Sequence, residues 1–528
     1  MTCHRRHHLF SKLSLAACLS LAACNASTRR SHQTAKLEGE PPRAAGPLAT
    51  SRDDAGVVES GNECSDAPPG KRTCVGKESF ECAGDRRGIL RETCSAACVD
   101  GYCTCNFGPE PSCTAQPTAP CATQGANVRI LDIVGGSGYT CVLLDGGCVR
   151  CWTGPLRSTG KENGEGAPWT SPANEGQLGT PGRTLADQNS LWDREANVPL
   201  GGKAIAIHAK QDHTCAILEG GCVRCWGRND KGQLGLGHTH SVGDDEPPSV
   251  YPPVRLGGPV KTIALGSAFS CALLDDGAVR CWGSGNDGQL GLGNAADLGD
   301  RTSPLAACPI PLGRTATMIT SGAEYACALL DNGSVRCWGS DSSGALGLPW
   351  ELLKALPFPK RDLAGFDRQP IGDNETPLSV PPVNLKGRAI AIAAGDAHTC
   401  AQLEDFSVYC WGDNSFYQLG SDLPEQVDQP QAKPVAFSRP VAGALFAGGT
   451  FTCIRSAGGS LHCLGSSRSR RSVYQDCCSH GRPHRATLPQ AGLHRLSNGD
   501  NARQLLLEPG DGGPCILVSD TTIRCWRK

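Results

Sequence analysis

Several features that often reveal an activity are missing from this 528-residue chain. It contains no GxSxG, HExxH or phosphate-binding glycine loop, so the usual signatures of serine hydrolases, zinc hydrolases and nucleotide enzymes are absent. The formal net charge is only −2, which gives no general attraction to nucleic acid. Beyond the N-terminal region, no apolar run is long enough to cross a membrane. We therefore predict a protein that is not an enzyme and that binds no cofactor, nucleotide, nucleic acid or resident metal.

Cysteine, by contrast, is abundant, with 31 residues, and much of it recurs in a repeated phrase. One copy reads SCALLDDGAVRCWGSGNDGQLGLG and begins at Ser270. Seven copies share one spacing between two cysteines, although the distance between copies varies, so the spacing reports geometry inside each unit. The pairs are Cys141/Cys151, Cys215/Cys225, Cys271/Cys281, Cys327/Cys337, Cys400/Cys410, Cys453/Cys463 and Cys515/Cys525.

Each pair fits a disulfide across a β-hairpin. Short apolar runs flank a loop such as 275–277, and a three-residue loop with glycine last places Cys271 opposite Cys281. Directly opposed residues are close enough for a disulfide. Zinc ligation is the weaker alternative, because structural zinc sites favour shorter spacings. Phe406 and Thr521 stand where other copies have glycine, so those two hairpins are expected to turn differently.

The N-terminus predicts export. A basic start is followed by an 11-residue apolar stretch, Leu13 to Ala23, and then by LAAC, which resembles the lipobox of bacterial lipoproteins. Cys24 would then carry the lipid and begin the mature protein. A conventional signal peptide cut nearby is the alternative. We expect a bacterial cell-envelope protein that contacts the membrane through its lipid anchor alone, in an oxidising compartment that permits disulfides.

Four regions follow from composition. Residues 1–23 are the signal peptide, and residues 24–61 form a polar, flexible tether. Residues 62–121 form a cysteine-rich mini-module, which is too small for a real core and needs disulfides. Residues 122–528 carry the seven repeats. The sequence does not determine the disulfide partners of the cysteines at 64–121. It also leaves undetermined those of five others: Cys148, Cys222, Cys308, Cys477 and Cys478.

The repeats predict an all-β propeller with seven blades. Both alternating faces of the short strands are apolar, so each sheet must be covered on both sides by its neighbours. A tryptophan follows the second cysteine in six copies and is expected to be core between blades. The seventh copy stops shortly after Cys525, and an open edge there would be unfavourable. We expect residues 114–125 to supply the strand that closes the ring.

The full phrase, from the first cysteine through CWG to GQLG, resembles the regulator of chromosome condensation repeat. That resemblance implies a seven-bladed propeller and covers about 400 residues. It is strong in the second to fourth copies and weak in the first, sixth and seventh. Nucleotide exchange on a nuclear GTPase does not carry over, because an exported chain meets no such partner and no exchange-loop motif matches.

The function predicted is binding of a protein partner through loops on a rigid disc. Trp350, Phe358 and Phe366, in a long insertion at 349–376, are the candidate partner-binding residues, with packing of the insertion as the open alternative. Two alternatives to this function remain. One is a propeller enzyme acting on polysaccharide or a similar envelope polymer, and the other is a purely structural envelope protein. Carboxylates converging at the disc centre would favour an enzyme.

Overall fold

The computed structural model describes residues 129–153, 175–181, 197–355, 369–420, 423–428, 430, 442–456 and 461–465. It also describes the backbone of strands within 72–104 and 504–525. Strands β1 (Arg72–Val75), β2 (Glu78–Cys82) and β3 (Gly88–Thr93) form one antiparallel sheet. Strands β4 (Ala97–Val99) and β5 (Tyr102–Thr104) form a hairpin. Among the described residues, no helix combines the length and the apolar character needed to cross a membrane.

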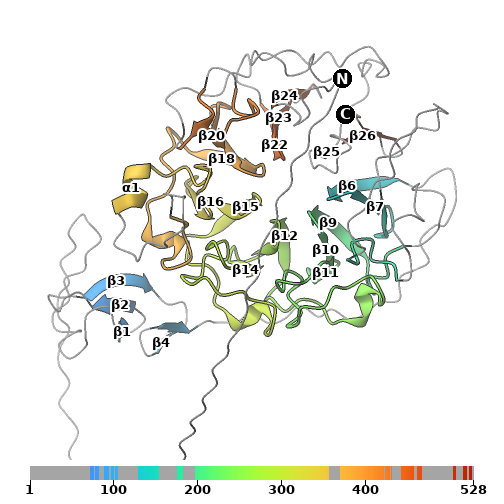
Figure 1. The fold of residues 1–528 in the computed structure, drawn as a ribbon, viewed down its shortest axis with the longest axis horizontal. Helices are drawn as coiled ribbons and strands as arrows, with labels where there is room; N and C mark the ends of the chain where they lie inside the picture. Colours follow the sequence, from blue (N-terminus) through green and yellow to red (C-terminus); the bar gives the residue numbers. More distant parts are fainter. Residues whose placement is uncertain are drawn as a thin grey trace, which may run out of the picture. The chain divides into compact units, whose positions relative to one another are not determined.

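The repeat region consists of seven successive antiparallel sheets (Figure 1). The strands of the first four sheets are β6 (Ile130–Gly136), β7 (Tyr139–Leu144), β8 (Val149–Thr153); β9 (Ala204–Lys210), β10 (His213–Leu218), β11 (Val223–Gly227); β12 (Val260–Leu265), β13 (Phe269–Leu274), β14 (Val279–Gly283); and β15 (Ala316–Ser321), β16 (Tyr325–Leu330), β17 (Val335–Gly339). The last three contain β18 (Ala389–Ala394), β19 (His398–Leu403), β20 (Val408–Asp413), β21 (Gln426–Val427); β22 (Gly443–Gly448), β23 (Phe451–Ser456), β24 (Leu461–Gly465); and β25 (Gln504–Leu506), β26 (Cys515–Ser519), β27 (Thr522–Cys525). Short helical segments connect some of them, namely η2 (Pro248–Val250), η3 (Pro304–Ala306), α1 (Trp350–Ala355) and η4 (Pro377–Ser379).

The sheets are arranged as the blades of a propeller. The first strand of each sheet contacts the first strand of the next, from β6 through β9, β12, β15 and β18 to β22. Strands β25 and β26 of the seventh sheet lie against β6 of the first, so the two ends of the repeat region meet. The all-β propeller predicted from the repeats is therefore the observed fold. The expected closing segment, residues 114–125, lies outside the described residues.

The hairpins follow the predicted register. In all seven sheets the two repeat cysteines are directly opposite each other. In the third sheet, Leu274 N–H donates to the Ala278 carbonyl (2.9 Å) across a three-residue loop that ends at Gly277. Gly277 has a φ of +83°, in the left-handed region that glycine adopts without strain.

The expectation for Phe406 is wrong. Its N–H donates to the Leu403 carbonyl (2.9 Å), the bond that Gly277 makes to Leu274, so this hairpin turns as the others do. Phe406 adopts a φ of +64° and leaves 41% of its surface exposed. The bonded turn overrides the preference of a bulky side chain for negative φ. The expectation for the seventh copy is confirmed, because its strands pair as far as Ser519 and Thr522 around a shorter loop.

Replacing Phe406 by glycine is expected to stabilise the protein by about 1 kcal/mol. The gain from releasing the left-handed strain exceeds the extra chain entropy that glycine gives the unfolded state. The melting temperature of Phe406→Gly should rise, and Phe406→Ala, which keeps a Cβ, should gain less. A lower melting temperature for Phe406→Gly would show that the exposed ring packs usefully in this position.

The repeat tryptophans join consecutive sheets, as predicted for core residues. In four of them the indole Nε1–H donates to a backbone carbonyl in the GQL or GAL segment of the preceding repeat. The bonds run from Trp226 to Gln177 (3.0 Å), Trp282 to Gln233 (2.9 Å), Trp338 to Gln289 (3.0 Å) and Trp411 to Ala345 (2.8 Å). All four side chains are fully buried, and Trp152 is 2% exposed. The tryptophan and the GQL segment are thus two halves of one joint between sheets.

The first glycine of GQLG is required by close backbone packing. A Cβ at Gly176 would lie 2.2 Å from the Val242 carbonyl oxygen, which belongs to the outer segment of the next repeat. At Gly232, a Cβ would lie 2.3 Å from the Asp300 nitrogen. The fifth repeat has Tyr417 in this position, with a φ of +62° and 51% of its surface exposed. Tyr417 is therefore held in a backbone conformation that favours glycine.

Candidate functional site on the turn-side face

We call the side of the propeller that carries the turns between first and second strands the turn-side face, and the side that carries the cysteine hairpins the hairpin side. On the turn-side face, backbone hydrogen bonds link the turns of neighbouring sheets. The bonds are Ser137 N–H to Gln211 (2.6 Å), Ser267 to Ala323 (2.8 Å), Ala323 to Asp396 (2.8 Å) and Asp396 to Gly449 (3.1 Å). This chain of bonds fixes the turn side chains around the propeller axis.

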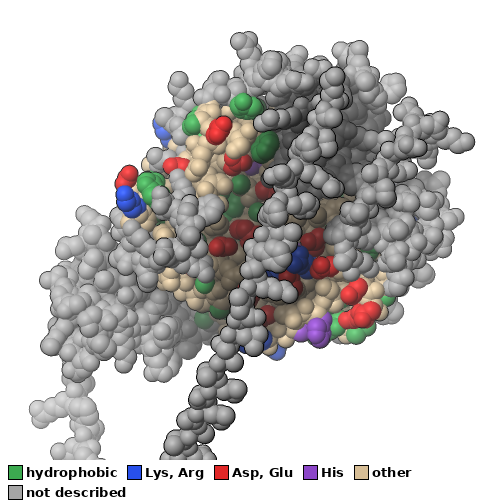
Figure 2. Space-filling model, in the orientation of Figure 1, with side chains coloured by type: hydrophobic (Ala, Val, Ile, Leu, Met, Phe, Trp, Pro, Cys, Tyr) green, Lys and Arg blue, Asp and Glu red, His purple; other side chains and the backbone are tan. Residues whose placement is uncertain are grey.

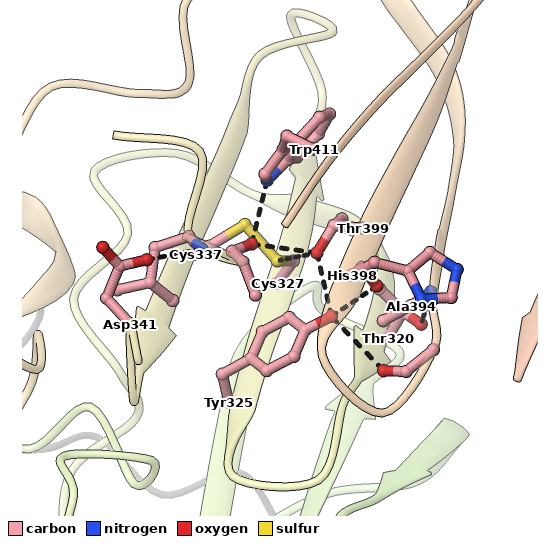
Figure 3. Close-up of a disulfide and its surroundings, with 12 residues drawn as sticks. Thr320, Tyr325, Cys327, Cys337, Asp341, Ala394, His398, Thr399 and Trp411 are labelled. Atoms are coloured by element: carbon pink, nitrogen blue, oxygen red, sulfur yellow. Dashed lines mark hydrogen bonds between the residues drawn. A yellow bond between two sulfur atoms is a disulfide. The ribbon is translucent and has the colours of Figure 1, made fainter. Parts of the chain in front are cut away.

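Buried pairs of polar side chains lie directly after these turns, at the start of the second strands, and join neighbouring sheets. In the first six sheets a tyrosine, histidine or phenylalanine begins the second strand. Where it is tyrosine or histidine, it pairs with the second residue of the equivalent strand in the next sheet. Figure 3 shows one junction, where Thr399 Oγ1 bonds to Tyr325 Oη (3.0 Å) beside the Cys327–Cys337 disulfide. His213 Nε2 meets Ser270 Oγ (3.1 Å), and His398 Nε2 meets Thr452 Oγ1 (2.8 Å).

These histidines are structural, as predicted from their fixed position in the repeat. His213 and His398 are fully buried, and burial lowers the pKa of each to about 4. Neutral rings are therefore the ordinary state, and each ring holds a hydroxyl of the next sheet. Burial also raises the pKa of Tyr325 above its usual value, which keeps its hydroxyl protonated as a donor to the His398 carbonyl (2.6 Å).

One buried lysine crosses the centre of the turn-side face. Lys210 is 5% exposed, and its Nζ lies 3.3 Å from Asp396 Oδ1. Lys210 belongs to the second sheet and Asp396 to the fifth, so the ion pair joins sheets that are not neighbours. The equivalent positions of the third and fourth sheets are Gly266 and Gly322, where a Cβ would lie 1.8–1.9 Å from the following aromatic ring.

Several carboxylates lie near Lys210 or near Arg228. Arg228 lies 2.8 Å from Asp230, 3.5 Å from Glu175 and 3.7 Å from Asp212. The charges of Asp287 and Lys210 shift the pKa of Glu324 in opposite directions. The charges of Asp396 and Asp413 both favour a higher pKa for His398. We call this set the axial cluster; it holds seven carboxylates and two cations, Lys210 and Arg228. Figure 2 shows acidic side chains around the middle of one face of the described sheets, with few basic ones between them.

Glu324 is an acid of the axial cluster with a raised pKa. Burial raises its pKa above the usual value, and the charge of Asp287 raises it further. Hydrogen bonds from Ser267 and from Gln289 Nε2 (3.2 Å) oppose the shift. A carboxyl with a raised pKa thus lies beside the carboxyl of Asp287, where added positive charge would be stabilised.

Tyr417 lies on the same face. Strand β20 ends at Asp413, whose N–H donates to the Ala397 carbonyl (2.8 Å) in the turn beside Asp396. The loop that follows carries Tyr417, held by its N–H to the Asn414 carbonyl (2.9 Å). The sequence shows this aromatic only as a departure from GQLG, and sequence reasoning missed it as a surface feature.

The other predicted site residues fall into three groups. Six of the seven predicted cysteine pairs are disulfides, Cys141–Cys151, Cys215–Cys225, Cys271–Cys281, Cys327–Cys337, Cys400–Cys410 and Cys453–Cys463. Trp350 begins α1 and is half-buried, while Leu353 of that helix is 1% exposed, so the base of the insertion packs onto the propeller. Cys24, Phe358, Phe366 and the side chains of Cys515 and Cys525 lie outside the described residues.

Possible metal ligands are limited in the part of the chain that is described. There, a single group of three candidate residues lies close together: Asp244, Asp245 and Glu246. Glu246 accepts a hydrogen bond from Tyr251 (2.5 Å). Repeat four has Asp373 and Glu375 at matching positions, so these acids belong to a recurring turn. The hairpin acids also have cationic partners; Asp331 pairs with Arg314 (2.5 Å), and Glu404 with Arg388 (3.0 Å).

The family of the repeats is shown by comparison with family models. The regulator of chromosome condensation (RCC1) repeat matches residues 204–233, 260–289, 319–345 and 389–418. A second model of the same repeat matches residues 220–273 and 276–329. The chain therefore contains RCC1 repeats, as the phrase from the first cysteine to GQLG predicted.

Curated relatives share the repeat region. The ultraviolet-B receptor UVR8 of Arabidopsis thaliana is 28% identical over 306 residues, 56% of this chain and 61% of the relative. The probable E3 ubiquitin-protein ligase HERC6 of Homo sapiens is 30% identical over 225 residues, 42% of this chain and 19% of the relative. The chain thus matches less than two thirds of the length of these relatives.

Two solved structures are similar to this chain, each with a TM-score below 0.5. Yeast RCC1 (Prp20), crystallised bound to Kap60, is 17% identical, with a TM-score of 0.49 over 71% of this chain and 77% of that one. Human WBSCR16 is 15% identical, with a TM-score of 0.48 over 76% of this chain and 88% of that one.

Proposed function

We propose that this chain is a lipid-anchored, extracytoplasmic protein-interaction propeller of a bacterial cell envelope, and that its partner docks on the turn-side face. The disulfides of consecutive hairpins support an oxidising location, and the LAAC motif supports lipidation of Cys24. We also propose the domain organisation that the sequence predicts, with residues 24–61 as tether, 62–121 as mini-module and 122–528 as propeller. The RCC1 fold alone does not decide the activity, because similar repeats occur in a receptor and in ligases.

The observation that carries the proposal is Tyr417. Its ring is exposed, and its backbone has a conformation that costs a non-glycine residue about 1 kcal/mol or more. Strain of this kind is typical of functional positions, and tyrosine is enriched among residues that dominate protein interfaces. The axial cluster beside it has an excess of negative charge. The partner we propose therefore presents lysine or arginine side chains to this face.

The test is capture of a partner from envelope extracts by the full-length chain. Tyr417→Gly should bind at least tenfold more weakly, and yet melt at a higher temperature, because the strain is removed. Phe406→Gly is the matched control: it removes the same kind of strain at the hairpin side and should leave capture unchanged. Capture that is equal for wild type and Tyr417→Gly would contradict the proposed face.

Anchoring is tested separately. Labelled palmitate should enter the wild-type chain and leave Cys24→Ala unlabelled. Equal labelling of both would contradict lipidation at Cys24 and leave the propeller unanchored.

A second candidate is an enzyme acting on an envelope polymer. It is favoured by the carboxylates of the axial cluster, where burial and the charge of Asp287 raise the pKa of Glu324. A pair of neighbouring carboxyl groups, one of them with a raised pKa, suits glycoside hydrolysis. Release of sugars from envelope polysaccharide by the wild type, abolished in Glu324→Gln, would establish this function in place of binding alone.

A further inference from the structure

Three cysteines outside the repeat pairs share a place in the fold. Cys148 and Cys222 follow the hairpin loops of the first and second sheets and are 6% and 2% exposed. Cys308 lies two residues before Ile310, whose N–H donates to the carbonyl of Val279 (2.8 Å), the first residue of β14 after the third hairpin. All three therefore lie at the hairpin side of consecutive sheets.

Each of these three cysteines is in a disulfide bond. Their partners are not one another, because no disulfide among the described residues joins them. Nor are they the repeat cysteines of the first six sheets, which are used in hairpin disulfides. In the seventh sheet, Cys515 lies opposite Cys525, as in the other hairpins.

Counting the remaining cysteines narrows the choice. If Cys24 carries lipid and the seventh hairpin closes like the others, two cysteines remain after the sixth sheet, Cys477 and Cys478. Three cysteines of the propeller need partners, so at least one must bond within residues 62–121. That segment contains nine cysteines. Because nine is odd, complete oxidation also requires a bond that leaves the segment.

We propose that disulfides from Cys148, Cys222 and Cys308 hold the cysteine-rich segment 62–121 against the hairpin side of the first three sheets. Each bond forms from two thiols by exchange with the disulfide of a thiol oxidoreductase, which takes up the two electrons and both protons and leaves as a dithiol. The inference rests on the oxidising location in the proposed function. It explains how a segment too small for its own core is kept in one place.

The arrangement determines which face is presented. The hairpin side and the turn-side face are at opposite ends of every second strand. A segment bonded to the hairpin side leaves the axial cluster and Tyr417 uncovered.

The experiment uses the full-length exported chain with a protease site inserted within residues 122–128. After thiol alkylation and cleavage, the two fragments should run together on a denaturing gel without reductant and separate after reduction. Cys148→Ser, Cys222→Ser and Cys308→Ser combined should let them separate without reductant. Cys271→Ser with Cys281→Ser, which removes a hairpin disulfide, should keep them together.

Peptide mapping of the unmutated chain gives a second readout that does not depend on folding of variants. At least one peptide from residues 62–121 should be cross-linked to a peptide containing Cys148, Cys222 or Cys308. Fragments that separate without reductant would overturn the proposal, and so would mapping of all three cysteines to partners outside 62–121. Neither outcome affects partner capture through Tyr417, so the two proposals fail separately.

Discussion

Glu375→Gln is expected to raise the free energy of unfolding by about 3 kcal/mol at pH 8 and by much less at pH 4. Glu375 is 4% exposed in the outer segment of the fourth repeat, and burial followed by the charge of Asp373 raises its pKa from 4.5 to about 7. The folded chain therefore holds this proton more tightly than the unfolded chain does. The contribution to stability is fully present below pH 4.5 and is lost as the pH rises through 7.

Urea unfolding at several pH values measures this effect. The wild type should lose stability between pH 4.5 and 7, and Glu375→Gln should lose less over the same range. Asp373→Asn should lower the pKa of Glu375 by removing the neighbouring charge, and should therefore give an intermediate slope. The same stability difference between wild type and Glu375→Gln at pH 4 and pH 8 would show that the side chain acts through packing alone.

The location of Glu375 explains why this acid is buried. Gly372 packs against the third repeat, where its Cβ would lie 2.2 Å from the Gly288 carbonyl oxygen, and its N–H reaches Glu375 Oε1 (3.3 Å). The carboxylate thus completes a turn at a junction between two sheets. Its titration is expected to loosen this junction before other parts of the ring.

The local features of the repeat could be predicted from sequence. A fixed cysteine spacing with glycine at the end of the loop defines a hairpin register, and Cys271 lies opposite Cys281 as that register requires. Tryptophan at one place in each copy has one role, which is burial against the preceding repeat. Such features depend on residues within one unit or on the neighbouring unit, so the repeated phrase contains enough information to derive them.

Contacts across the ring could not be predicted. Lys210 meets Asp396 although 185 residues separate them, and nothing in either repeat indicates which sheets face each other across the axis. Phe406 and Tyr417 were visible as departures from glycine, but propensity alone suggested a different turn at Phe406. The structure shows that the backbone hydrogen bonds of the repeat prevail over that local preference.

The junction between the last and first sheets differs chemically from the others. At four junctions the repeat tryptophan donates to a backbone carbonyl of a GQL or GAL segment. The buried Trp152 Nε1, in the first sheet, has no hydrogen-bond partner among the described residues. The same side chain thus has two different environments within one ring, which provides an internal comparison.

Trp338→Phe is expected to cost about 2–4 kcal/mol, and Trp152→Phe clearly less. In Trp338→Phe, the Gln289 carbonyl loses its indole donor and a cavity is left, whereas Trp152→Phe breaks no hydrogen bond and removes an unpaired buried donor. Trp338 gives the clearest test. At two other junctions the acceptor carbonyl receives a second hydrogen bond, from Ser270 to Gln233 and from Thr399 to Ala345. The equivalent residue at the Trp338 junction is Ala326, which has no hydroxyl. Both variants are measured by urea unfolding, with the alanine variants, expected to lose about 3–5 kcal/mol each, as the reference for packing. Equal losses for the two phenylalanine variants would mean that the indole hydrogen bond contributes nothing to the joint, and that packing of the ring alone connects the sheets.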